Sequence, residues 1–197
     1  TGSNGLIGSA AVSFFANKAD LVIGLDNNMR KHFFGDDGDT KWNEKNLKNN
    51  FKNFIPHNID IRDIDELKKI FKKYNSNIDL IIHTAAQPSH DWATKDPILD
   101  FQVNANGTLN LLQLTNLFSK DAVFIFTSTN KVYGDKPNHL PLIELEHRWE
   151  LESSHVFFKN GINETMSIDN TTHSIFGASK VAADIMTQEY GKYFGMR

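Results

Sequence analysis

Three glycines near the first residue of the sequence have the spacing of a phosphate-binding turn. They form Gly2-x-x-Gly5-x-x-Gly8, and the largely apolar run 10–15 follows at once. Glycine permits positive φ angles and a close approach of the backbone, and the first turn of a helix offers free N–H groups to an anion. We therefore expect a pyrophosphate to lie on this turn, in contact with Gly2, Gly5, Ile7 and Gly8.

An acidic residue follows at the distance expected for a dinucleotide site. Asp26 ends the apolar run 21–26 and stands 18 residues after Gly8, close to the roughly 20-residue offset of the acid that binds the adenosine ribose. A carboxylate there hydrogen-bonds the ribose hydroxyls and repels a 2′-phosphate. We therefore expect NAD rather than NADP, with Asn27 sharing the contact.

Short apolar runs alternate with helical patterns along the chain. We expect strands at 21–26, 79–83 and 122–127, because runs this apolar suit a parallel sheet covered on both faces. We expect helices at 64–74, at about 98–119, and from Ser174 onward. This alternation predicts an α/β fold with a doubly wound parallel sheet, a Rossmann-like domain. The polar segment 27–55 and the segment 134–173 show no clear period, and we expect them to be irregular.

The composition excludes several classes of function. A net charge of -3 gives no reason to expect nucleic acid as a partner. No apolar run reaches the ~18 residues of a membrane span. The 197 residues include no cysteine, so a thiolate nucleophile is excluded; no histidine pair has zinc spacing, and we expect no metal. The absence of cysteine fits a cytoplasmic protein.

Five sequence blocks resemble, in order, those of the extended short-chain dehydrogenases/reductases of the NAD-dependent epimerase/dehydratase family. The blocks lie at 1–8, 60–63, 83–86, 104–108 and 127–134. The resemblance implies that residues 1–197 are one NAD-binding Rossmann-like domain that lacks its first strand. It also implies that most of a C-terminal substrate domain lies outside this chain, so we expect the chain alone to be inactive.

The resemblance also implies further cofactor contacts. Asp60 and Ile61 correspond to the turn at the adenine ring. The small-residue loop over the cofactor corresponds to Thr84, Ala85 and Ala86. Asn104 begins the family's Asn-x-x-Gly-Thr helix motif, which implies that it also contacts the cofactor. Lys180 is implied to bind the nicotinamide ribose.

By the same resemblance, Thr129 fills the role of the catalytic Ser or Thr, and Lys180 that of the lysine beside the catalytic tyrosine. The tyrosine position, four residues before Lys180, holds Phe176. Phenylalanine has no ionisable proton and cannot be the acid/base group. An active enzyme with this chemistry would therefore need a substitute base. His173, one helical turn earlier, is the first candidate, and Tyr133 is an alternative.

The residues after Thr129 bear on the reaction. Dehydratases of the family usually have Asp-Glu there, whereas this chain has Asn130 and Lys131, which disfavours dehydration. The string 128–135 resembles the 2-epimerases of CDP-activated dideoxyhexoses, as do 84–92, 167–169 and 173–184. The resemblance implies a nucleotide-sugar substrate, CDP-linked by preference, and allows a homo-oligomer. Another reaction of the superfamily, or a silent protein that binds NAD and nucleotide sugar without turnover, remains open.

Overall fold

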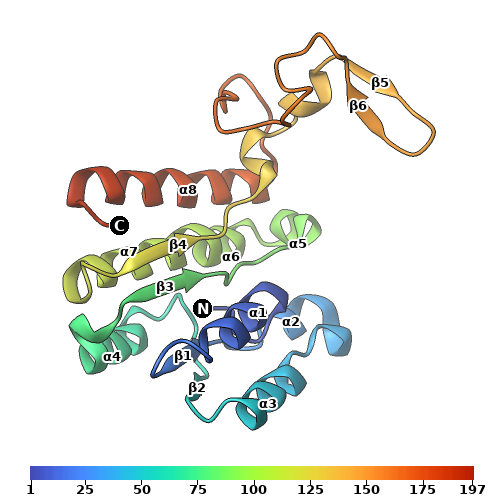
Figure 1. Cartoon of the computed structure of the whole chain (residues 1–197). Coiled ribbons are helices and arrows are strands. Elements are labelled where there is room, and N and C mark those ends of the chain that lie inside the picture. Colours follow the sequence, from blue (N-terminus) through green and yellow to red (C-terminus); the bar gives the residue numbers. More distant parts are fainter.

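The computed structural model describes residues 1–197 and shows helices on both sides of short parallel strands (Figure 1). The strands are β1 (Val22–Leu25), β2 (Phe54–His57), β3 (Leu80–His83), β4 (Val123–Phe126), β5 (Leu142–Glu144) and β6 (Trp149–Leu151). The α-helices are α1 (Leu6–Phe15), α2 (Arg30–Phe34), α3 (Lys41–Asn50), α4 (Ile64–Tyr74), α5 (His90–Lys95), α6 (Pro97–Phe101), α7 (Gly107–Phe118) and α8 (Ser174–Phe194). The expected strands and helices are therefore present, within a residue or two at their ends.

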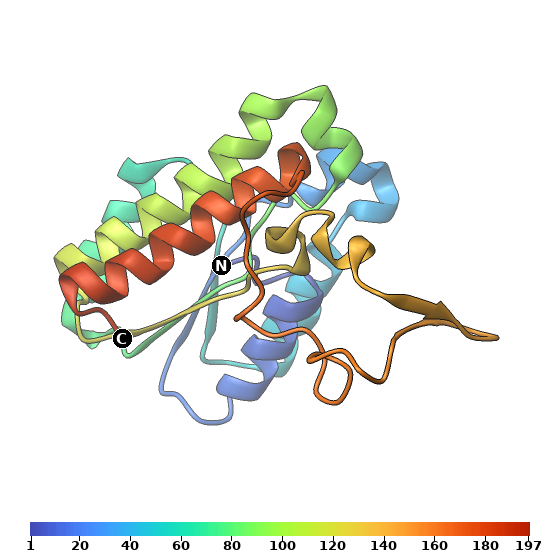
Figure 2. The same cartoon turned by 90° about the horizontal axis from the view of Figure 1, so that it is seen from above.

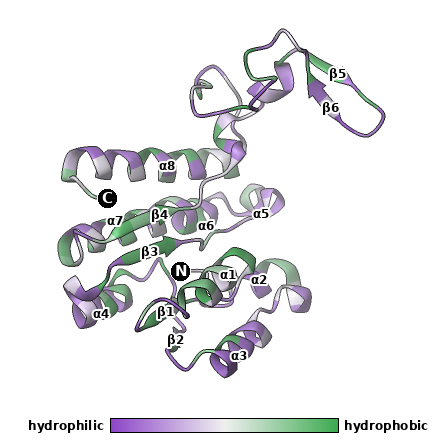
Figure 3. Cartoon of the chain, in the orientation of Figure 1, coloured by the Kyte–Doolittle hydropathy of each residue, from purple (hydrophilic) through white to green (hydrophobic).

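Two hydrophobic cores lie on opposite faces of the strands, as a doubly wound fold requires. One core joins α4 and α7 to β3, with Leu67, Ile81 and Leu111 at its centre. The other joins α1, α3 and β2, which contribute Val12, Leu47 and Phe54 respectively. Figure 2 shows α7 and α8 side by side on one face and α1 on the other. In Figure 3, β3 and β4 are hydrophobic, whereas α3 is largely hydrophilic.

The parallel strands form two separate pairs. β1 pairs with β2, with Val22 opposite Phe54, and β3 pairs with β4, with Leu80 opposite Val123. No ladder joins β1 to β3. At the carboxyl ends of these strands Thr1 bridges the two pairs, because its amino group donates to the carbonyl of Ile82 at 2.8 Å while Gly2 N–H donates to that of Leu25 at 2.8 Å.

A cavity of about 250 Å³ lies between β1 and β3, and we call it the strand slot. Sixteen of the 21 residues that line it are hydrophobic. They come from both strands and from the helices on both faces, and include Val12, Leu25, Phe71, Ile81 and Leu111. The strand slot thus has apolar walls and an unpaired strand edge on each side.

The expectation that 27–55 is irregular was wrong. This segment contains α2, α3 and β2. Of the ten residues of α3 only Leu47 is buried, so the helix carries almost no apolar period. In β2, Pro56 interrupts the strand pattern, which an edge strand tolerates.

The segment 134–173 is mostly irregular, as expected, with one small antiparallel hairpin of β5 and β6. Figure 1 shows this hairpin projecting from the body beyond the first turn of α8. The helix expected at 98–119 is α6 and α7 joined by a π-helical turn (Gln102–Asn106). None of the helices combines the length and the apolarity needed to cross a membrane.

Candidate functional site

The glycine turn before α1 is packed too closely for any other residue at two positions. Gly2 has a φ of +66°, and a Cβ there would lie 2.8 Å from the backbone nitrogen of Ala85. A Cβ on Gly8 would lie 2.0 Å from the carbonyl oxygen of Gly2. The turn therefore presents bare backbone, as the sequence predicted for a phosphate cradle.

The first turn of α1 is open to a ligand. Gly5 is the N-cap and provides no side-chain hydrogen bond, so the first N–H groups of the helix have no intrahelical acceptor. Leu6 is 86% and Ile7 57% exposed. Free N–H groups at the positive end of a helix fit the pyrophosphate of a dinucleotide.

Asp26 follows β1 directly and orients the turn. One of its carboxylate oxygens accepts from the N–H of Asn4 at 3.0 Å, and the other accepts from the N–H of Asn28 at 2.8 Å. Asn4 was not predicted from the sequence; its side chain is 2% exposed and also donates from its amide group to Glu44 at 3.3 Å. Asp26 therefore stands beside the cradle, with lone pairs left for ribose hydroxyls.

Asn27 is hydrogen-bonded to Asp60, which lies a few residues after the end of β2. The Asn27 amide donates to Asp60 at 3.0 Å, and Arg62 forms an ion pair with Asp60 at 2.6 Å. Burial alone would raise the pKa of Asp60, but the hydrogen bonds from Arg62 lower it below its ordinary value. Ile61 is buried, and its carbonyl accepts from Asn110 on α7 at 3.0 Å. The predicted adenine-side residues thus lie together at one edge of the strands.

The loop after β3 is bound to the glycine turn. Thr84 donates from Oγ1 to the carbonyl of Thr1 at 2.7 Å, and the N–H of Ala85 donates to Oγ1 of Thr1 at 3.3 Å. His83 is 1% exposed between Thr1 Oγ1 at 2.7 Å and Thr108 Oγ1 at 2.9 Å. Burial lowers the pKa of His83 well below its ordinary value, so its imidazole is neutral.

Asn104 lies in a buried polar network rather than on an open surface. Its Oδ1 accepts from the N–H of Gln87 at 2.9 Å. Its Nδ2 donates to Asp100 Oδ1 and to Ser179 Oγ, each at 3.1 Å. Asp100 is fully buried, and burial raises the pKa of its carboxyl group. The network joins the loop after β3 to α8, and the expected contact of Asn104 with the cofactor stays a prediction.

Lys180 reaches the carboxyl end of β4 from α8. Its Nζ donates to the carbonyl of Thr127 at 3.0 Å and lies 4.2 Å from the centroid of the Phe126 ring. Burial lowers the pKa of Lys180 to about 8, although Asp184 and Asp100 act to raise it. Ser128 and Asp184 are also hydrogen-bonded. These contacts fix α8 against the strand end that carries Thr129.

Thr129 caps the short 3-10 helix Asn130–Tyr133. Its Oγ1 accepts from the N–H of Lys131 at 3.3 Å and makes a long contact of 3.4 Å with Asn130. The N–H of Lys131 uses Oγ1 of Thr129 only as an acceptor, so the hydroxyl proton stays free to be donated. A substrate oxygen could accept this proton in place of Asn130. Because Lys180 binds the carbonyl of Thr127, only two residues before Thr129, both side chains belong to the same end of β4.

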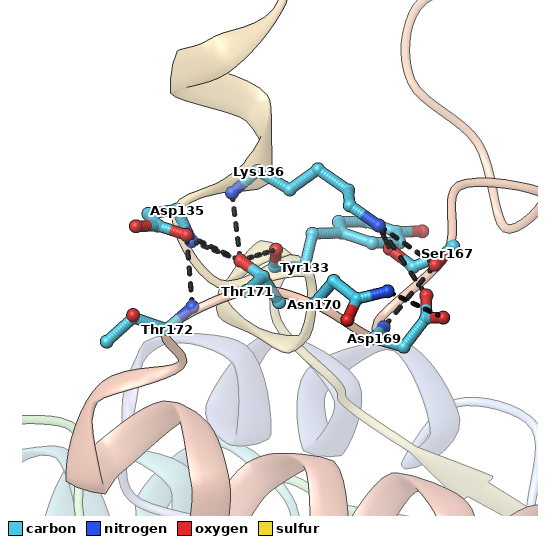
Figure 4. A network of polar contacts seen from close by, with 8 residues as sticks. All are labelled: Tyr133, Asp135, Lys136, Ser167, Asp169, Asn170, Thr171 and Thr172. Atoms are coloured by element: carbon cyan, nitrogen blue, oxygen red, sulfur yellow. Dashed lines mark hydrogen bonds and ion pairs between the residues drawn. The ribbon is translucent and has the colours of Figure 1, made fainter.

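A polar clasp fixes the segment after Thr129 to the segment before α8 (Figure 4). Thr171 Oγ1 accepts from the N–H groups of Asp135 and Lys136, both at 3.1 Å, and lies 2.6 Å from the Asp135 carboxylate. The Lys136 ammonium donates to Ser167 at 2.9 Å. The clasp also holds Tyr133, whose carbonyl lies 3.2 Å from Thr171 Oγ1.

Of the candidate bases, His173 lies at the start of α8, and Tyr133 ends the 3-10 helix after Thr129. His173 is the N-cap of α8 and makes no side-chain capping bond. Phe176 is 8% exposed, and its ring contacts the imidazole of His90, with centroids 4.7 Å apart. Burial raises the pKa of the Tyr133 phenol. His90 was not predicted from the sequence, because its contact with Phe176 joins distant segments. No cluster of three or more His, Asp or Glu side chains is arranged for a metal ion.

Comparisons with known proteins give a consistent result. The sequence profile of the NAD dependent epimerase/dehydratase family matches residues 1–197. The CDP-paratose 2-epimerase of Salmonella typhi is 32% identical over 196 residues, which is 100% of this chain and 53% of that protein. The putative UDP-glucose 4-epimerase of Methanocaldococcus jannaschii is 34% identical over 145 residues, 73% of this chain and 41% of that protein. The chain thus spans about half the length of these curated relatives.

A solved structure supports the same fold. The UDP-glucose 4-epimerase of Thermus thermophilus, in complex with NAD, matches with a TM-score of 0.70 and 25% identity, over 100% of this chain and 51% of that chain. This likeness confirms the predicted Rossmann-like α/β fold.

Proposed function

Because the chain belongs to the NAD dependent epimerase/dehydratase family, we propose that it is the cofactor-binding part of a nucleotide-sugar epimerase. The family match confirms the predicted resemblance, and NAD is the cofactor of the family. The reaction proposed is 2-epimerisation of a CDP-linked dideoxyhexose. The 32% identity to a CDP-paratose 2-epimerase over the whole chain supports that substrate class.

One observation carries the proposal: the ammonium group of Lys180 lies at the end of β4, beside the backbone that leads to Thr129. The lysine donates to the Thr127 carbonyl at 3.0 Å, and Thr129 follows two residues later. When bound, NAD supplies the two-electron acceptor that a sugar carbon needs to become a ketone and to be reduced again from its other face. Thr129 would donate a hydrogen bond to the reacting oxygen, and Lys180 would hold the nicotinamide ribose.

The cofactor contacts proposed for this chain likewise follow from the position of each residue in the fold. The Gly5 N–H donates to the Gly2 carbonyl at 3.1 Å, so the N–H groups of Leu6, Ile7 and Gly8 would bind the pyrophosphate. Asp26 with Asn27 would bind the adenosine ribose. Asn130 and Lys131 offer no carboxylate after Thr129, so elimination of water is disfavoured. A nucleotide sugar is the proposed partner; a homo-oligomer and a cytoplasmic location stay predictions.

Two alternatives are tested together with this proposal. Another epimerisation is favoured by the similarity to a putative UDP-glucose 4-epimerase, and a reduction is the other reaction of the superfamily to be tested. A silent binding protein is favoured by Phe176, which removes the usual acid/base group.

The experiment incubates the complete gene product with NAD and either CDP-paratose or UDP-glucose in D₂O, and follows the sugar by NMR. We expect the 2-epimer of CDP-paratose without deuterium at C2, because the hydrogen is carried by the cofactor. Turnover of UDP-glucose alone would move the reaction to C4. Binding of both ligands without turnover would establish the silent alternative.

A further inference from the structure

Phe176 leaves the reaction without its usual proton acceptor, at a place that the structure defines closely. It lies on the inner face of α8, four residues before Lys180, and is 8% exposed. The oxidation of an alcohol carbon needs a base for the hydroxyl proton. Whatever replaces the tyrosine must therefore reach the sugar from beside this phenyl ring.

His90 is the side chain that lies there. It is the first residue of α5, which packs against α8. Its imidazole centroid is 4.7 Å from that of Phe176, with the ring planes tilted by 54°. Its Nδ1 approaches Ser174 Oγ at 3.5 Å, and its Nε2 has no partner in the structure. His90 is exposed, so this nitrogen is open to a ligand.

The backbone that carries His90 is held firmly. Ser89 caps α5, since its Oγ accepts from the N–H of Trp92 at 3.2 Å. The Trp92 indole donates to the carbonyl of Phe33 at 2.7 Å, and the two rings pack with centroids 5.5 Å apart. Gln87 donates to the carbonyl of Ser89 at 2.8 Å and to Asp100 at 2.8 Å. A base in a near-attack position needs such fixed support.

His173, the candidate from the sequence, is less well placed. It precedes α8 as the N-cap, and no ring contact joins it to Phe176. Both histidines lie near the first turn of α8, but the imidazole that covers the phenyl ring comes from α5.

We propose that His90 is the acid/base residue of this protein, in place of the tyrosine hydroxyl that Phe176 lacks. The proposal rests on the epimerase function proposed above. In the oxidation, the sugar O–H bond breaks and its proton passes to Nε2 of His90. The adjacent C–H bond breaks with its electron pair transferred to NAD⁺, and the C=O bond forms. In the reduction, the hydrogen returns to the opposite face and His90 gives the proton back.

The experiment compares five forms of the complete gene product: wild type, His90→Gln, Phe176→Tyr, the double variant His90→Gln/Phe176→Tyr, and His147→Gln. His147 lies on the exposed hairpin and is the matched control. We measure epimerisation of CDP-paratose with NAD, and separately the affinity for CDP-paratose by calorimetry. We expect His90→Gln to lower kcat by about 10²-fold or more, with the affinity changed less than about threefold. The double variant should recover most of the activity.

The outcomes separate this proposal from the proposed function. An active wild type with a fully active His90→Gln variant would overturn the role of His90 and leave the epimerase standing. Parallel loss of affinity and turnover, without rescue by tyrosine, would make His90 a packing residue. A wild type that turns over no nucleotide sugar but becomes active as Phe176→Tyr would overturn both proposals.

Discussion

Lys180 donates a hydrogen bond of 3.0 Å to the carbonyl of Thr127, and this bond places a nearly buried ammonium group at the carboxyl end of β4. The lysine is 4% exposed, and the nearby Phe126 ring covers one side of it. A buried ammonium group loses most of its hydration, and one hydrogen bond replaces only part of the stabilisation that water gives to its charge. The site therefore holds a lysine whose charge is costly to keep.

The first prediction follows from that cost. The pKa of Lys180 falls from 10.5 to about 8 on folding, so between these pH values the unfolded chain binds more protons than the folded chain. The free energy of unfolding should therefore rise with pH across this window, by about 3 kcal/mol from this group. Urea unfolding of the complete gene product at about pH 7.5 and about pH 10 measures it.

The control for this prediction is a second lysine of α8. Lys180→Met should remove the rise, whereas Lys192→Met should keep it, because the Lys192 side chain is 68% exposed. An identical pH dependence in wild type and Lys180→Met would mean that Lys180 is solvated in solution.

The second prediction concerns the choice of cofactor. Asp26 uses each carboxylate oxygen to bind one backbone N–H, from Asn4 and from Asn28. A 2′-phosphate would meet this fixed negative charge, so NADP should bind about 30-fold or more weaker than NAD, a difference of ~2–4 kcal/mol. Fluorescence titration with each cofactor measures it. Asp26→Asn should narrow the gap, and the exposed Asp20→Asn should not; equal affinities in the wild type would remove Asp26 from its proposed role.

The third prediction concerns the hydroxyl of Thr129. If it donates to the oxygen that becomes a ketone, Thr129→Val should lower kcat by about 10²-fold, the usual effect of one oriented donor. Valine also loses the capping bond from Lys131. Thr129→Ser keeps both the hydroxyl and the cap and should stay within about tenfold of wild type. If serine and valine were equally active, the hydroxyl would have no part in the reaction.

Local sequence patterns predicted the strands and helices of the proposed cofactor site, but they could not predict contacts between distant segments. Asp26 could be placed at a strand end because an apolar run and a glycine spacing are both local signals. Helix α3 could not be predicted from the sequence, because Leu47 is its one buried residue among lysines and asparagines. Its stability comes from tertiary packing against Phe54 rather than from its own period.

In the candidate site, too, local motifs were predictable from the sequence and contacts between distant segments were not. The motif around Lys180 was predicted by resemblance, and the structure places the lysine against Thr127. The contact between His90 and Phe176 joins two helices far apart in sequence, and no spacing rule encodes it. The buried position of Asn104, between Gln87 and Ser179, likewise depends on the packing of three segments.

The last prediction concerns the strand slot. β1 and β3 face each other without a ladder, and the cavity of about 250 Å³ between them is lined mainly by hydrophobic side chains. Thr1 and Gly2 already bond to both neighbours at the carboxyl end, in the manner of the last residues of a central strand. We therefore expect the slot to take one parallel strand of about four or five residues that runs into Thr1. Without it, open edges and apolar walls should make residues 1–197 aggregation-prone and inactive.

The test compares three polypeptides: residues 1–197, the same chain preceded by five Val and Ile residues, and the same chain preceded by five Gly and Ser residues. The apolar extension should give a monodisperse protein with cooperative unfolding. It should also slow hydrogen exchange at Ile23 and Leu25, whose N–H groups face the slot because those of Val22 and Asp26 bond toward β2. The polar extension has the same length but cannot fill an apolar cavity, so it should behave like residues 1–197. If residues 1–197 alone were monodisperse and protected at Ile23 and Leu25, the slot would need no strand, and the expectation of an absent first strand would be wrong.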